Sequence, residues 1–255
     1  MKKHDGYIRH VEAAKTCVVF CHGILGSPRH FDELALLVPR EFSICNILLE
    51  GHGGSVIDFG KSNMRIWESQ VSTIVESLSE KYENIIYVCH SMGSLFGLEN
   101  AIKTSSIKSL FVLASPLYPH VAFKSVVISA RIIFQKEENL GEIAAAKNQV
   151  CSVKLTKKLW QYISWIPRFC QLLAKSKQTR KIIQKVKCNG VFLQSAHDEV
   201  VMRKSSKLIS QNKNFKLITL ENSSHYLYSC EDKEIISREF KKLMQRHSSQ
   251  KKSGK

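Results

Sequence analysis

Residues 85–96 read Ile-Ile-Tyr-Val-Cys-His-Ser-Met-Gly-Ser-Leu-Phe and place Ser91 between an apolar, strand-like run and a run that favours a helix. A sharp strand-to-helix turn holds its central serine in a strained backbone conformation and requires small residues two positions to either side. Those residues are Cys89 and Gly93, so a cysteine stands where the pattern usually has glycine. The stretch predicts either a nucleophilic serine or a serine that only caps the following helix.

On both sides of this turn, short β-branched or apolar runs alternate with longer runs of helical periodicity. This alternation indicates an α/β fold with a mostly parallel sheet flanked by helices. The expected strands are residues 7–11, 16–21, 42–48, 85–89, 110–114, 191–194 and 215–220. The expected helices are residues 28–38, 66–81, 92–103, 203–211 and 232–246.

The chain contains one long insertion. Between Ala114 and Val191 lie 76 residues, many more than one crossover helix needs. We predict helices at 121–136, 141–150, 155–175 and 177–187, with Pro167 breaking or kinking the third. The resulting division is an α/β core at 1–116 and 188–245, a helical cap at 117–187 and a basic flexible tail at 246–255. Ligands bind beyond the carboxyl ends of parallel strands, so the cap is expected to cover the ligand.

A second loop carries features that suit the chemistry of Ser91. Residues 18–27 read Val-Val-Phe-Cys-His-Gly-Ile-Leu-Gly-Ser, a strand that runs into His-Gly and a glycine-bearing loop. A tetrahedral intermediate needs N–H donors aimed at its developing oxyanion. The backbone N–H groups of Ile24 and Met92 are the candidates for this oxyanion hole. The alternative is an ordinary turn between a strand and a helix.

An acid and a base follow two later strands. Residues 190–200 carry Asp198 and Glu199 after a strand-like run, and residues 215–225 run through Glu221 to His225. A serine nucleophile needs a base, and the base needs an acid that orients it. The chain order Ser, Asp, His, each just after a separate strand, fits this requirement. The remaining histidines of the loops, at positions 22, 52 and 90, are expected to brace those loops instead of transferring protons.

Together these motifs resemble the α/β-hydrolase family of serine hydrolases, in particular bacterial carboxylesterases and monoacylglycerol lipase-like or lysophospholipase-like enzymes. The motifs are residues 22–24, 51–55 (Gly-His-Gly-Gly-Ser), 90–94, 197–200 and 224–225, and the resemblance covers residues 7–245. It implies a catalytic triad of Ser91, Asp198 and His225, with Asp198 favoured over Glu199 and Glu221. Glu50 departs from the pattern, because many relatives carry arginine before Gly-His-Gly.

The resemblance implies acyl transfer through an acyl-enzyme, without a cofactor. A serine at position 91 disfavours the dehalogenase and epoxide-hydrolase branches of the fold, which use a carboxylate nucleophile. The expected substrates are carboxylic esters with short to medium acyl groups, or monoacylglycerol-like and lysolipid-like molecules. The cap residues Phe123, Trp160 and Trp165 are expected to line an acyl pocket, with core packing as the alternative. A thioesterase or peptidase with the same triad, and a non-catalytic protein that binds lipid or a membrane surface, remain alternatives.

The charge of the chain is uneven. It has 38 Lys and Arg against 22 Asp and Glu, a net charge of +16. Residues 117–187 carry 14 basic and 3 acidic side chains, and residues 241–255 carry 6 basic and none acidic. In residues 155–175 the lysines are interleaved with aromatic and aliphatic side chains, which favours contact with an anionic membrane surface. An acidic substrate, or no specific role, would also fit. Nucleic acid is a weaker interpretation, because no recognised binding motif accompanies the charge.

The sequence also predicts the compartment. The longest uncharged stretches, 84–98 and 109–123, have 15 residues each, fewer than the roughly 20 that span a bilayer. The apolar run 17–21 is too short for a signal peptide. Four of the eight cysteines, at 17, 21, 45 and 89, lie in apolar runs, and no Cys-x-x-Cys pair suggests a metal site. We expect buried, reduced thiols and a cytoplasmic protein that can associate with the inner membrane face.

Overall fold

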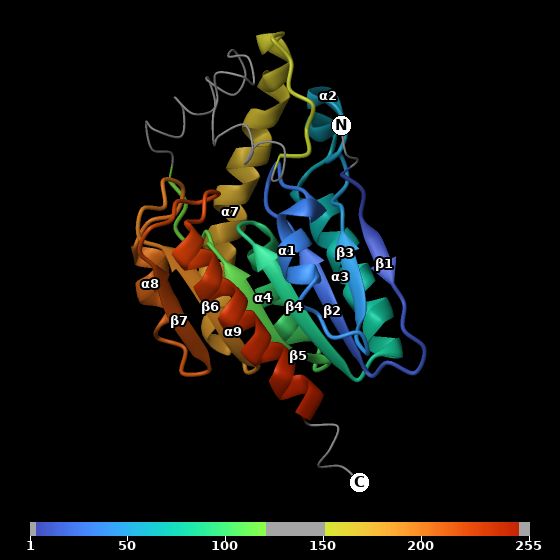
Figure 1. Ribbon diagram of the computed structural model, residues 1–255. Helices are drawn as coiled ribbons and strands as arrows, with labels where there is room; N and C mark the ends of the chain where they lie inside the picture. Colours follow the sequence, from blue (N-terminus) through green and yellow to red (C-terminus); the bar gives the residue numbers. More distant parts are fainter. Residues whose placement is uncertain (1–3, 121–150, 250–255) are drawn as a thin grey trace.

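The computed structural model describes residues 4–120 and 151–249 of the chain. Within them, seven strands form one sheet in the order β1-β3-β2-β4-β5-β6-β7, as Figure 1 shows. β1 pairs antiparallel with β3, and the other neighbours are parallel. The strands are β1 (Tyr7–Arg9), β2 (Thr16–Cys21), β3 (Ser43–Ile47), β4 (Asn84–His90), β5 (Ile107–Leu113), β6 (Asn189–Ser195) and β7 (Phe215–Leu220). All seven overlap the predicted stretches, and the expected fold class is confirmed.

Helices cover both faces of this sheet (Figure 1). On one face lie α3 (Met64–Lys81), α4 (Gly93–Lys103) and α7 (Ile166–Ile182), with Trp67, Tyr87 and Leu95 in the core between them and the sheet. On the other lie α1 (Asp32–Ala35) and α9 (Cys230–Ser249), where the Phe240 ring packs on Phe111. The central strands are therefore apolar on both sides, as is usual for parallel sheets.

The helices of the body agree with the sequence prediction, with two differences. The stretch predicted as one helix at 28–38 forms a short 3-10 helix, η1 (Pro28–Phe31), followed by α1. The sequence analysis missed α2 (Val56–Lys61), which begins with a capping box between Ser55 and Asp58. The spacing Ser-x-x-Asp was the signal that could have revealed it. α8 (Lys204–Ile209) lies within the predicted range 203–211.

The inserted region is described only in part. The predicted helices at 121–136 and 141–150 lie outside the described residues. The predicted division into helices 155–175 and 177–187 is wrong: a 3-10 helix, η3 (Leu159–Trp165), runs into α7, which continues to Ile182 and ends in η4 (Ile183–Lys185). Pro167 does not break this helix, because it lies in the first turn of α7, where its missing N–H costs no hydrogen bond.

α7 joins the inserted region to the body. Its buried side consists of Leu172, Lys175, Ser176 and Thr179. The Lys175 ammonium pairs with Glu68 of α3 at 2.9 Å and also with Glu99 of α4. These ion pairs bind α7 to both neighbouring helices. The cap and core boundaries expected from the sequence remain a prediction.

All eight cysteines lie in the described residues and none forms a disulfide. Those at positions 17, 21, 45 and 89 are buried, as the sequence predicts, and burial raises the pKa of Cys45 to about 11. Buried thiols of this kind act as small apolar side chains. No helix in the described parts of the chain combines the length and apolarity needed to cross a membrane.

Candidate active site

Ser91 occupies a strained turn between β4 and α4. Its φ is 50°, in the left-handed region that L-residues other than glycine seldom adopt, and its N–H donates to Leu113 at 2.9 Å. A Cβ at Gly93 would overlap the carbonyl oxygen of Cys21, so this position needs glycine. Cys89, at the other small position, is fully buried, and its thiol donates to the Phe111 oxygen at 3.8 Å. A cysteine is therefore small enough for this site.

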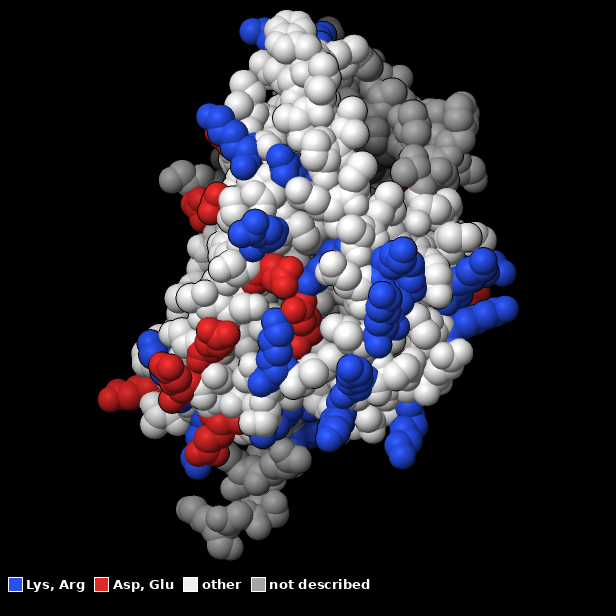
Figure 2. All heavy atoms as spheres, turned by 180° about the vertical axis from the view of Figure 1, so that it is seen from behind, with Lys and Arg blue, Asp and Glu red and all other residues white. Residues whose placement is uncertain are grey.

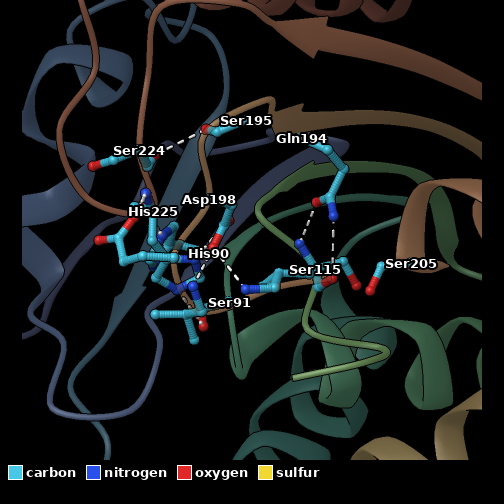
Figure 3. A network of polar contacts seen from close by, with 12 residues as sticks. His90, Ser91, Ser115, Gln194, Ser195, Asp198, Ser205, Ser224 and His225 are labelled. Carbon is cyan, nitrogen blue, oxygen red and sulfur yellow. Dashed lines mark hydrogen bonds and ion pairs between the residues drawn. The ribbon is translucent and has the colours of Figure 1, made fainter. Parts of the chain in front are cut away.

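Three side chains from three loops form one hydrogen-bonded chain. The Nε2 atom of His225 lies 3.0 Å from the Ser91 hydroxyl, and its Nδ1 atom lies 2.8 Å from the Asp198 carboxylate. A carboxylate only accepts hydrogen bonds, so Nδ1 carries the proton and Nε2 accepts from Ser91. Asp198 follows β6 and His225 follows β7, so the parallel topology brings both to the edge where β4 ends (Figure 3). The side chains of His225 and Asp198 are almost completely buried.

The structure distinguishes the three candidate acids. Asp198 is the one whose carboxylate contacts the His225 ring, and it also accepts the backbone N–H groups of Val200 at 2.8 Å and Val201 at 2.7 Å. These two N–H donors hold the carboxylate in place beside the ring. Glu199 instead accepts the backbone N–H of His225 at 3.0 Å, a positioning contact that the sequence analysis missed. Glu221 is exposed at the end of β7.

The loop after β2 lies directly against Ser91. A Cβ at Gly23 would come within 2.8 Å of the Ser91 Cβ, so only glycine allows this approach. The next residue is Ile24, and Met92 follows Ser91 as the N-cap of α4. Neither backbone N–H donates a hydrogen bond to another described residue. The two predicted oxyanion donors therefore lie beside the serine, one of them at the positive end of a helix.

A segment after the undescribed residues holds the loop that contains Ile24. Ser152 donates its N–H to the Leu25 oxygen at 3.1 Å and its hydroxyl to the Gly26 oxygen. Two residues later, the N–H of Lys154 donates to Gly54 at 2.9 Å. Residues 151–154 thus connect two loops at the carboxyl edge of the sheet. No sequence motif pointed to Ser152, because its partners lie more than 120 residues away.

His90 braces the proposed base. Its Nε2 atom donates to the main-chain oxygen of His225 at 3.0 Å, and the two rings lie 4.9 Å apart. On its other side, the His90 ring stacks on His30 with centroids 4.2 Å apart. Burial keeps the pKa of His90 well below its ordinary value, so this ring stays neutral near pH 7. A neutral, hydrogen-bonded ring orients its neighbours, as expected from the sequence.

His22 and His52 also brace loops. His22 accepts the Leu49 N–H at Nε2 (3.1 Å) and therefore donates from Nδ1 to the Gly23 oxygen at 2.9 Å. Its ring lies 4.7 Å from that of His52, which contacts the Glu50 oxygen at 3.3 Å. Burial lowers the pKa of His22 well below the usual value and that of His52 to about 4. Both neutral rings hold the loop after β2, which contains Ile24 and which we call the oxyanion loop, against the Gly-His-Gly loop at residues 51–53.

The residues expected to line an acyl pocket lie in different surroundings. Trp160 is 65% exposed, with the Lys158 ammonium 5.9 Å from the ring centroid. Trp165 is buried, its indole N–H donates to the Val56 oxygen at 2.9 Å, and its ring packs edge-on against Phe59. Trp165 thus docks η3 on α2, whereas Trp160 faces solvent. Phe123 lies outside the described residues.

A strained serine, a histidine and an aspartate at the carboxyl edge of this sheet are arranged as in serine hydrolases of the α/β-hydrolase fold. The sequence matches the model of the family described as serine aminopeptidase, S33, over residues 12–232. The chain belongs to that family. No curated protein matches the sequence.

Solved structures share the fold. A metagenome-derived lipolytic enzyme, one of LipS and LipT, has a TM-score of 0.72 at 18% identity and covers 96% of this chain and 98% of its own. A soluble variant of monoglyceride lipase from Saccharomyces cerevisiae has a TM-score of 0.70 at 14% identity, with coverages of 95% and 90%. The monoacylglycerol lipase of Paleococcus ferrophilus has a TM-score of 0.65 at 15% identity, with coverages of 94% and 99%. At these identities the likeness concerns the fold.

Proposed function

We propose that this protein hydrolyses carboxylic esters through an acyl-enzyme formed on Ser91. The observation that carries the proposal is the continuous hydrogen-bonded chain from the Ser91 hydroxyl through His225 to Asp198. In the first half-reaction, His225 Nε2 takes the hydroxyl proton as Ser91 Oγ attacks the carbonyl carbon, and then gives it to the leaving alcohol. The N–H groups of Ile24 and Met92 stabilise the oxyanion. In the second, His225 takes a proton from water, which attacks the acyl carbon, and returns it to Ser91.

The charge of the described cap segment supports an ester over a peptide N-terminus. An aminopeptidase must hold the free ammonium of its substrate, for which a carboxylate is the natural partner. Residues 151–187 contain ten Lys and Arg and no Asp or Glu, so this segment repels a cation. The proposed substrates are esters with short to medium acyl groups, or monoacylglycerol-like and lysolipid-like molecules. Names of the structural relatives, which include lipolytic enzymes and monoacylglycerol lipases, point the same way.

The test compares three classes of substrate: esters, thioesters and aminoacyl anilides. Purified protein is assayed on p-nitrophenyl esters of rising chain length, on acyl thioesters and on aminoacyl p-nitroanilides, with Ser91→Ala as the blank. We expect the highest kcat/KM on an ester, and mass spectrometry should locate a fluorophosphonate adduct on Ser91. Higher kcat/KM on the anilide or thioester would assign the protein to the peptidase or thioesterase alternative. Absence of both turnover and labelling would favour a binding protein.

We also propose that the protein works in a reducing compartment, the cytoplasm. Four of its eight free thiols, including Cys170 and Cys230, are not buried. Free thiols persist where glutathione and thioredoxin keep them reduced. Fractionation of the source cells tests this: the protein should appear with cytoplasmic markers or on the inner membrane face. Recovery from a secreted fraction would contradict it.

A further inference from the structure

One side of η3 and the first half of α7 is apolar and exposed. We call it the apolar face. Its members are between 39% and 66% exposed and recur at helical spacing, whereas Trp165 and Leu172 of the same helices are buried against the body. The apolar face comprises Leu159, Trp160, Ile163, Ile166, Phe169 and Leu173. Contiguous exposed apolar surface on a soluble protein marks an interaction site.

The surroundings of the apolar face are cationic. Lys157 and Lys158 precede it and are exposed, and Lys177 and Lys181 continue along the exposed side of α7 beyond Leu173. Residues 151–187 contain no acidic residue. In Figure 2, the upper end of the molecule, where α7 begins, is largely uncharged apart from Lys or Arg side chains at its rim, and lower on the same view Lys and Arg side chains lie together with Asp and Glu. An apolar tip flanked by lysines matches the composition of helices that lie in a bilayer interface.

The apolar face lies on the same side of the molecule as Ser91. α7 projects past the carboxyl edge of the sheet, the edge at which β4 ends in the Ser91 turn (Figure 1). A short connection from η3 leads back to Ser152, which holds the oxyanion loop at Leu25 and Gly26. A surface bound at the apolar face would therefore lie beyond the edge of the sheet at which Ser91 is placed.

We propose that the apolar face docks on an anionic lipid membrane. Charge complementarity selects this partner: the lysines around the face attract an acidic leaflet, whereas a second copy of a chain with a net charge of +16 would be repelled. Trp160 has an apolar ring with a polar N–H, and the neighbouring Lys158 suits the headgroup layer in the same way. The inference goes beyond the proposed function, because docking requires neither Ser91 nor turnover.

Vesicle binding by the full-length Ser91→Ala variant tests the proposal independently of catalysis. We expect co-sedimentation with mixed phosphatidylcholine–phosphatidylglycerol vesicles, little with phosphatidylcholine alone, and weaker binding as salt rises. Tryptophan emission should shift to the blue on binding. Trp67 and Trp165 are buried, so the shift reports Trp160, and Trp160→Phe should remove most of it.

Variants of the face distinguish docking from unspecific attraction. Ile163→Ser combined with Ile166→Ser should weaken binding at least tenfold, and Lys157→Gln combined with Lys158→Gln should weaken it about 30-fold, near fivefold for each lysine. Matched controls are Leu36→Ser, at a position 86% exposed just after α1, and Lys204→Gln with Lys207→Gln on α8. Both should bind like the parent, and melting curves should show that all variants are folded.

Several outcomes would overturn the proposal. These are equal or absent binding to both vesicle types, and face variants that bind as tightly as the controls. Sedimentation velocity provides a third: a dimer that dissociates in the Ile163→Ser, Ile166→Ser variant would assign the face to a second copy of the chain.

Discussion

The hydroxyl of Ser152 donates to the main-chain oxygen of Gly26, so a residue of the inserted region holds the loop that presents the Ile24 N–H. The backbone N–H of Ser152 adds a second bond to Leu25 at 3.1 Å, and Gly26 donates back to Gly23 at 3.0 Å. A proposed oxyanion donor is thus positioned by a segment that follows it by more than 120 residues.

Ser152→Ala should lower kcat about tenfold and leave KM nearly unchanged. Oxyanion donors act mainly in the transition state, so a misplaced donor affects turnover more than substrate binding. Steady-state kinetics on a soluble ester measures kcat and KM separately. Ser79→Ala is the matched control, because Ser79 also donates its hydroxyl to a main-chain oxygen but lies on exposed α3 surface. A change in KM alone would argue against this role for Ser152.

Ser91→Ala should abolish ester hydrolysis, with a loss of roughly a million-fold in rate. The three residues act as a unit, so His225→Ala should have a similar effect. The free energy of unfolding should change little, because alanine occupies the same small space. Active-site titration before each assay excludes contamination by parent enzyme. A variant that retains a tenth of the activity would refute Ser91 as the nucleophile.

Asp198→Asn should lower kcat by about four orders of magnitude, since the amide no longer fixes the Nδ1–H tautomer of His225. Glu199→Gln should cost tenfold or less, because an amide oxygen still accepts the His225 N–H. Glu221→Gln, on the surface, serves as the control. Measuring kcat for the three variants under the same conditions ranks their losses of activity. If Glu199→Gln were almost inactive and Asp198→Asn remained active, Glu199 would be the acid of the triad instead of Asp198.

The free energy of unfolding should fall as pH decreases from about 6.5 towards 4. His22, His52 and His90 have lowered pKa values in the fold. Below the ordinary histidine value the unfolded chain therefore takes up protons that the native chain does not, until the native pKa is reached. Each histidine contributes up to about 1.4 kcal/mol per pH unit. Urea titrations across this range should show a shallower slope for His52→Phe, and an unchanged slope would contradict the argument.

Trp160→Ala should leave the acyl-chain profile on soluble esters unchanged, since its ring faces solvent. Trp165→Ala should instead destabilise the fold by about 3 kcal/mol, the usual cost of removing a large buried side chain. Rates on p-nitrophenyl esters and urea unfolding of both variants check these expectations. A shift in the preferred acyl-chain length of Trp160→Ala would instead support the sequence prediction that Trp160 lines the acyl pocket.

The sequence by itself determined the strands and the order of the functional loops. Apolar runs long enough to form a buried strand can be recognised from the local sequence. Ser91, Asp198 and His225 each follow one of these runs. In a parallel sheet the carboxyl ends of the strands meet at one edge, so the topology alone predicts that these loops converge. The capping box that starts α2 at Ser55 is also encoded in local spacing, although our sequence analysis missed this helix.

Only the tertiary structure distinguished residues of similar type that lie close together in the sequence. Asp198 and Glu199 are neighbours in sequence, and the direction of the chain after β6 sends one carboxylate to the His225 ring and the other to its backbone. Trp160 and Trp165 are the same residue type in one short segment, but the packing of η3 on α2 buries Trp165 and leaves Trp160 exposed. Ser152 meets Gly26 across the fold. Side-chain direction depends on contacts between segments far apart in the chain, and local patterns carry no information about those contacts.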